Sequence, residues 1–198
     1  MKLAAALRAA VAALDAFGVS YAVIGGLAVS ARAEPRFTRD VDLVVAVSTD
    51  ASAEALLRFM LDNGWQLLAL VEHAQAARLG TARLIATAAG GITVDLAFAS
   101  SGVENEIVAK ADVLEIDGVP VPVATAGHLV ALKLLARDSH RPHDQGDLIA
   151  LADVLQPTDL EDAREAIHLI TERGFNRDRD LDALLDEYLT PRGPESRP

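Results

Sequence analysis

Asp40 and Asp42 are the residues of this sequence most suited to chemistry, because two acids flank one apolar residue in a run that reads as a β-strand. Side chains two residues apart in a strand point to the same face, and their Cα atoms lie about 6.5 Å apart. Two carboxylates at that spacing repel each other by roughly 2–3 kcal/mol at an effective dielectric constant of about 20. A divalent cation offsets this repulsion, so the pair predicts a metal site. The alternative interpretation is a solvated polar strand face.

Gly25 and Gly26 are a second feature with chemical potential. They follow a short β-prone run, Tyr21–Ile24, and precede a predicted helix over Leu27–Ala33. A strand that enters two glycines and then a helix leaves unpaired backbone N–H groups with no Cβ in the way, which suits the phosphate oxygens of a nucleoside triphosphate. The glycines match neither the Gly-x-Gly-x-x-Gly fingerprint nor the P-loop. The alternative is an ordinary strand-to-helix turn.

The glycine pair and the acid pair together resemble a known signature. Ile24-Gly25-Gly26, a spacer of thirteen residues and Asp40-Val41-Asp42-Leu43 are similar to the signature of the DNA polymerase β-like nucleotidyltransferase superfamily. That family places a third acid on a neighbouring strand, and Asp95, within Ile92–Leu96, lies at the corresponding place. The resemblance implies a metal site formed by Asp40, Asp42 and Asp95. A surface aspartate on a half-exposed strand is the alternative for Asp95.

The local sequence is closer to one subfamily, the abortive-infection (AbiEii-like, type IV) toxin nucleotidyltransferases. The run Arg36-Phe37-Thr38-Arg39 before Asp40 is similar to that family's Arg-x-Thr-x-Asp segment. In the C-terminal half, Leu129–Ala136 is apolar except for Lys133, and 141–148 resembles an Arg-Pro-x-Asp-x-x-Asp-Leu segment. The resemblance implies active-site roles for Lys133 and Asp144.

Both residues also have structural interpretations. Lys133 could extend its ammonium group to the surface from an otherwise apolar helix. Asp144 and Asp147 could cap the helix that begins there and complement its dipole.

Nucleotidyl transfer is the reaction that the resemblance implies: a hydroxyl attacks the α-phosphorus of a nucleoside triphosphate (NTP) and pyrophosphate leaves. Two Mg²⁺ ions held by the three aspartates would activate the hydroxyl and neutralise the triphosphate. The implied catalytic residues are Asp40, Asp42, Asp95, Lys133 and Asp144. The implied nucleotide-binding residues are Gly25, Gly26, Arg36, Thr38 and Lys133.

The identity of the acceptor stays open. The toxin resemblance implies transfer to the acceptor end of tRNA and a cognate antitoxin as partner. A tRNA site would need Arg36, Arg39, Arg137 and Arg141 gathered on the side of the cleft. The alternatives are a small-molecule nucleotidyltransferase of the aminoglycoside-resistance type, whose negative cleft would attract a cationic antibiotic, and a catalytically silent nucleotide-binding module.

The composition is that of a globular protein that acts inside the cell. The chain has 198 residues, a net charge of −11 and no cysteine, so disulfide frameworks and thiolate zinc sites are excluded. The charge disfavours a protein that coats nucleic acid by bulk electrostatics. No segment has the roughly 20 uninterrupted apolar residues of a membrane span. We therefore expect a cytoplasmic protein without membrane contact.

The order of predicted elements indicates a mixed α/β (α+β) fold. We expect a nucleotidyltransferase core over residues 1–123, a helical C-terminal lobe over 124–190 and a disordered tail over 191–198. The ligand site should lie in the cleft between core and lobe. A further strand is expected over Val119–Val123, and its Pro120 and Pro122 favour an edge position in the sheet. Helices are expected from the N-terminus to about Phe17, over Leu27–Ala33 and Ala51–Asn63, and over 125–137, 144–155, 159–173 and 180–189. The remaining predicted strands are Asp40–Val47, Ala82–Ala88, Ile92–Phe98 and Val113–Ile116.

Overall fold

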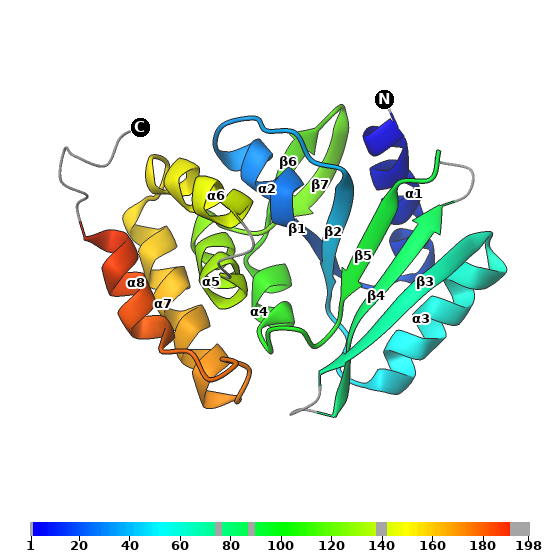
Figure 1. Cartoon of the computed structure of the whole chain (residues 1–198). Coiled ribbons are helices and arrows are strands. Elements are labelled where there is room, and N and C mark those ends of the chain that lie inside the picture. Colours follow the sequence, from blue (N-terminus) through cyan, green and yellow to red (C-terminus); the bar gives the residue numbers. More distant parts are fainter. Residues whose placement is uncertain (1, 74–76, 87–89, 138–141, 191–198) are drawn as a thin grey trace.

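An open, mixed sheet forms the centre of the molecule in a computed structural model that describes residues 2–73, 77–86, 90–137 and 142–190 (Figure 1). Its order is β3-β4-β5-β2-β1-β7-β6. Strand β2 pairs in parallel with β5 and antiparallel with β1, and β1 pairs in parallel with β7. The strands are β1 (Tyr21–Ile24), β2 (Asp40–Val45), β3 (Trp65–His73), β4 (Arg78–Ala86), β5 (Thr93–Ala97), β6 (Asp112–Ile116) and β7 (Val119–Val123).

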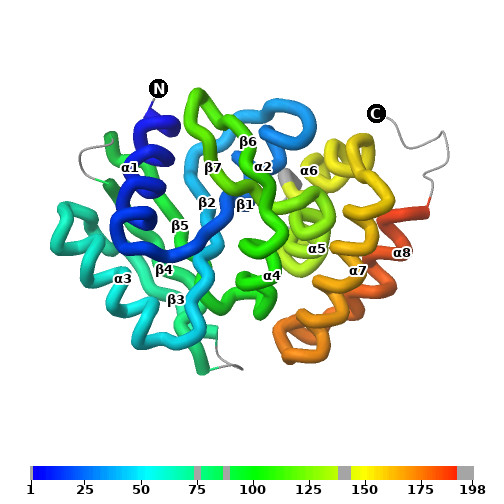
Figure 2. Tube along the Cα trace, turned by 180° about the vertical axis from the view of Figure 1, so that it is seen from behind, coloured from blue at the N-terminus to red at the C-terminus, as the bar shows by residue number. Residues whose placement is uncertain are grey.

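Helices border the sheet on two sides. Helices α1 and α3 cover one face, as the view from behind shows (Figure 2), and α5–α8 gather beside the β1 and β7 side of the sheet. The helices are α1 (Lys2–Phe17), α2 (Gly25–Arg32), α3 (Asp50–Asp62), α4 (Glu104–Ala109), α5 (Ala126–Ala136), α6 (Pro142–Ala152), α7 (Pro157–Glu172) and α8 (Leu181–Leu189). The α/β fold class is confirmed.

The alternation of β2 and β5 separates the core from the candidate site. Val41 and Leu43 of β2 are fully buried, whereas Asp40 and Asp42 are half-buried. Strand β5 repeats the pattern, with Val94 buried and Asp95 half-buried. Because the side-chain period of a strand is two, the apolar residues face the helix-covered side and the acids face the other side.

Three sequence expectations differ from the structure. Pro120 and Pro122 do not mark an edge strand, because β7 lies between β1 and β6. The register between β1 and β7 consists of the pair Val23 and Val123, beyond both prolines, so that ladder does not need their missing N–H groups. Strand β3 and helix α4 were not predicted. The run Trp65–His73 does not alternate, and most of its residues are exposed as an edge strand.

Two predictions lie partly or wholly outside the described residues. They are the end of the strand expected over Ala82–Ala88 and the tail 191–198. The division into core and lobe between residues 123 and 124 stays a prediction. In the described part of the chain, no helix combines the length and apolarity needed to cross a membrane.

Candidate active site

Sheet register brings the predicted acids onto one face. In the parallel pair of β2 and β5, Asp42 is the partner of Asp95 and Asp40 is the partner of Thr93. Neighbouring strands lie about 4.8 Å apart, and register partners point to the same face. The three aspartates therefore project from two adjacent strands onto the face opposite the helix-covered side.

Asp42 has the most perturbed carboxyl group of the three. Burial, followed by the negative charges of Asp40 and Asp95, raises the pKa of Asp42 to about 7. Lys133 and Arg83 act in the opposite direction. A buried carboxylate beside two others is the electrostatic setting that a divalent cation relieves.

The other two acids have side-chain partners in this structure. Thr38 Oγ1 donates to Asp40 Oδ1 at 3.2 Å. Arg83 donates twice to Asp95, from Nε to Oδ1 at 2.8 Å and from Nη2 to Oδ2 at 2.6 Å. Within the described ranges, no three acidic or histidine side chains are grouped closely enough to hold a metal ion. Arg83 could not be assigned to the site from the sequence, because its relation to Asp95 depends on the pairing of β4 with β5.

The glycine pair fits tightly against these groups. Gly25 has a φ of +64°, and a Cβ built there would overlap Asp42 Oδ2. A Cβ on Gly26 would lie 2.7 Å from Arg36 Nη2 and 2.8 Å from Thr38 Oγ1. Helix α2 begins at Gly25, and its N-cap residue Ile24 makes no side-chain cap. The first N–H groups of α2 thus lie beside Asp42 without a side-chain acceptor from the cap residue, as a phosphate site requires.

A second charged cluster joins the loop after α2 to helices α5 and α6. Lys133 Nζ lies 2.7 Å from Asp144 Oδ1 and 2.6 Å from Asp147 Oδ2. Arg36 completes the cluster, with its Nη2 donating to Asp147 Oδ2 at 2.9 Å. The Asp147 side chain is fully buried. Asp147 therefore does not simply cap helix α6 at the surface, because it is the centre of this cluster.

One cavity is lined by Gly25 and Asp42 on one side and by Lys133 and Asp144 of the second cluster on the other. It has a volume of about 210 Å³ and lies between the sheet and helix α5. Asp144 Oδ2 is buried and has no hydrogen-bond partner within the described part of the chain. The expected site between core and lobe is thus where the structure has a cavity. Its lining residues include Gly25, Asp42, Ser101, Leu132, Lys133 and Asp144.

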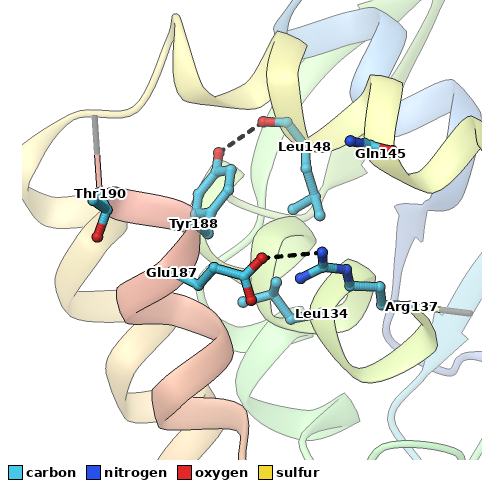
Figure 3. Close-up of a pocket in the computed structure, with 7 residues that line it drawn as sticks. All are labelled: Leu134, Arg137, Gln145, Leu148, Glu187, Tyr188 and Thr190. Atoms are coloured by element: carbon cyan, nitrogen blue, oxygen red, sulfur yellow. Dashed lines mark hydrogen bonds and ion pairs between the residues drawn. The ribbon is translucent and has the colours of Figure 1, made fainter. Parts of the chain in front are cut away.

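A second cavity, of about 320 Å³, lies between helices α5, α6 and α8 (Figure 3). Its main polar groups already interact with one another. Arg137 donates to Glu187 at 3.2 Å, and the Tyr188 hydroxyl donates to the Leu148 carbonyl at 2.9 Å. None of the predicted catalytic, nucleotide-binding or metal-binding residues lines this cavity, so the cavity beside Gly25 is the better candidate.

The arginines expected on the cleft side have different surroundings. Arg36 pairs with Asp147, Arg137 pairs with Glu187, and the Arg39 guanidinium lies 5.6 Å from the centre of the Phe37 ring. Arg141 lies outside the described residues. The described arginines therefore do not form a single basic patch around the acids.

Comparison with known families decides the membership of the chain. The model of the family described as nucleotidyl transferase AbiEii toxin, type IV TA system, matches residues 6–193. The chain belongs to this family. The AbiEii family membership makes the protein a nucleotidyltransferase, and it confirms the predicted resemblance. A search of curated protein sequences gives no significant match.

Solved structures show the same fold for this AbiEii family member. An antigenic nucleotidyltransferase-like protein from Paracoccidioides brasiliensis is 20% identical over 87% of both chains, with a TM-score of 0.51. ANT(2'')-Ia in complex with adenylyl-2''-tobramycin is 16% identical over 90% of this chain and 91% of its own, with a TM-score of 0.47. At 20% identity, the likeness to the Paracoccidioides brasiliensis protein shows the fold alone.

Proposed function

We propose that this AbiEii family member transfers a nucleoside monophosphate from an NTP to the acceptor end of tRNA in a metal-dependent reaction, and that it acts as a cytoplasmic toxin controlled by a cognate antitoxin. The observation that carries the proposal is the register of Asp42 with Asp95, beside Gly25, where an added Cβ would overlap the Asp42 carboxylate. This arrangement supports a site in which acidic ligands and the uncapped first turn of α2 act together.

The donor set has the chemistry of a hard divalent-cation site, because Asp40, Asp42 and Asp95 offer carboxylate oxygens from one face and Asp42 is buried among negative charges. In the described part of the chain, Arg83 binds both oxygens of Asp95, and the three carboxylates are not gathered around a common point. When bound, Mg²⁺ would neutralise triphosphate charge and acidify the attacking hydroxyl.

The protein groups on either side of the acids would position the substrate. The N–H groups at Gly25 and Gly26 suit the terminal phosphates, because they lie at the positive end of α2. Lys133 donates to Asp144 Oδ1 and its Nζ lies 2.6 Å from Asp147 Oδ2, so one of its three N–H groups can contact a phosphate or a ribose oxygen. Asp144 Oδ2 would accept a hydrogen bond from a substrate hydroxyl. The side chains of Thr38 and Arg36 lie close to Gly26 at the start of α2, and we assign them an indirect role in nucleotide binding.

The choice of tRNA rests on the family, whose members are named as toxins of type IV toxin–antitoxin systems. A cationic small-molecule acceptor is the second candidate, and the charge favours it. The net charge is −11, and Arg36 and Arg83 are each paired with a carboxylate.

Radioactive transfer assays distinguish these acceptors. The protein is incubated with Mg²⁺ and each of the four α-labelled NTPs, together with either total tRNA or an aminoglycoside panel. We expect label on tRNA with the wild type and none with Asp42→Asn, which keeps the side-chain volume but removes the charge. Asp50→Asn is the matched control. Asp50 lies on helix α3 and pairs with Arg78 of β4, so this variant is expected to leave transfer unchanged.

Each other outcome has a distinct meaning. Label on an aminoglycoside alone would replace the tRNA assignment by the small-molecule one. Binding of NTP and Mg²⁺ without labelling of any acceptor would identify a silent module. Full transfer by Asp42→Asn would refute the role of that carboxylate.

A further inference from the structure

Arg83 lies in line with the proposed metal ligands. It is the register partner of Asp95 across β4 and β5, and Asp95 is the partner of Asp42 across β5 and β2. The row Arg83, Asp95 and Asp42 therefore crosses three adjacent strands on one face. The Arg83 side chain is 50% exposed and the Asp95 side chain is 15% exposed, so the guanidinium covers the acid from the solvent side.

The Arg83 guanidinium binds both carboxylate oxygens of Asp95, whereas a single ion pair would leave one oxygen available. Its Nε and Nη2 donate to both carboxylate oxygens, at 2.8 and 2.6 Å. Such a paired, planar contact is the strongest form of arginine–carboxylate interaction. A cation that takes Asp95 as a ligand needs one of these same oxygens, and it also experiences repulsion from the arginine charge.

We propose that Arg83 and a divalent cation compete for the carboxylate of Asp95, and that Arg83 releases this carboxylate when the cation binds. Arg83 is a positioning residue: it holds the carboxylate of Asp95 in place until metal arrives, at the expense of metal affinity. The inference rests on the proposed metal role of Asp95.

Solvent access to the guanidinium makes such an exchange feasible. The Arg83 side chain is 50% exposed, so water screens its pair with Asp95 more than it screens a fully buried pair, and a metal ion can displace the arginine. The released guanidinium would turn toward solvent on the uncovered side. By contrast, Lys133 and Asp147 are buried at the second cluster and are not suited to exchange.

Metal affinity without nucleotide is the direct test. Binding of Mn²⁺ alone to the full chain is measured by electron paramagnetic resonance for the wild type and Arg83→Gln. Competition predicts that Arg83→Gln binds Mn²⁺ about threefold more tightly than the wild type. This fold-change is the one expected when the metal no longer has to displace a solvent-screened ion pair. Arg83→Lys retains the charge but loses the two-bond geometry, so its affinity should lie between the two.

Arg78→Gln is the matched control. Arg78 is on the same strand, pairs with a carboxylate at 2.6 Å and is 32% exposed, but its partner is Asp50 of α3. This variant removes the same charge from β4 and should bind Mn²⁺ like the wild type. Thermal unfolding of each variant identifies any loss of fold.

The results separate this inference from the proposed function. Equal or weaker Mn²⁺ binding by Arg83→Gln, with normal binding by the wild type, overturns the competition and leaves the metal site standing. Failure of both proteins to bind Mn²⁺ overturns the metal site and the competition together. As a second readout, Mg²⁺ added to ¹⁵N-labelled wild type should shift the Arg83 Nε–H resonance, and an unchanged resonance would contradict release of Asp95.

Discussion

The carboxylate of Asp147 lies 2.6 Å from Nζ of Lys133, and the Asp147 side chain is completely buried. This contact ties α6 to α5, and Arg36 extends the connection to the first turn of α2, because its Nη2 would lie 2.7 Å from a Cβ on Gly26. The cluster thus supports the start of α2 and the cavity wall at the same time. Its removal should affect both stability and nucleotide binding.

Asp147→Ala should lower the free energy of unfolding by about 3–5 kcal/mol, because it leaves Arg36 and Lys133 without their shared buried partner. Urea unfolding gives the measurement. Glu187→Ala is the control, since Glu187 is 63% exposed and pairs with Arg137 near the surface. It should cost less than about 1 kcal/mol. Similar losses in the two variants would show that the buried cluster contributes no special stability.

Gly25→Ala should abolish nucleotidyl transfer, because the added methyl group would displace the Asp42 carboxylate. The alanine would also have to keep the positive φ of Gly25. Gly18→Ala is the matched control: Gly18 has a φ of +81°, but nothing lies within 4 Å of the added Cβ. Both substitutions should cost about 1 kcal/mol in backbone strain. Steady-state transfer rates then isolate the contact with Asp42. Comparable rates in the two alanine variants would refute this role of Gly25.

Gly127→Ala should destabilise the packing of α5 on α7, because the new Cβ would overlap the carbonyl oxygen of Asp159. Backbone cannot yield as a flexible side chain does, so we expect a loss of about 1–3 kcal/mol in thermal or urea unfolding. The Cβ of Gly146→Ala, at an exposed position of α6, meets nothing within 4 Å, and this variant should instead gain up to about 1 kcal/mol. An unchanged or increased stability of Gly127→Ala would contradict the close approach.

His128 should make the protein less stable in mild acid. Its side chain is buried on α5 and bonded to Thr125, and burial lowers the pKa of the imidazole below its ordinary value. The unfolded chain then binds more protons below about pH 6.5, so the free energy of unfolding falls as the pH drops through that range. Urea unfolding between pH 7.5 and 5 should show a smaller decline for His128→Gln than for the wild type. Parallel declines would refute this contribution.

The sequence itself determined the residues of the site that follow from local pattern. Strand periodicity alone predicts that Asp40 and Asp42 share one face, because one apolar residue separates them. Gly25 and Gly26, between a predicted strand and a predicted helix, likewise predict a turn with a helix N-terminus. The same periodicity predicted most of the helices, and the alternation of β2 and β5 predicted which side is buried.

The tertiary structure decided the contacts between segments that are distant in the chain. Arg83 meets Asp95 because β4 and β5 pair in one register, and a shift by one residue would turn Arg83 to the other face. Asp147 contacts Arg36, 111 residues earlier in the chain, because α6 packs near α2 and the loop that follows it. Such pairings depend on the packing of complete elements, and the spacing of residues along one segment carries no information about them.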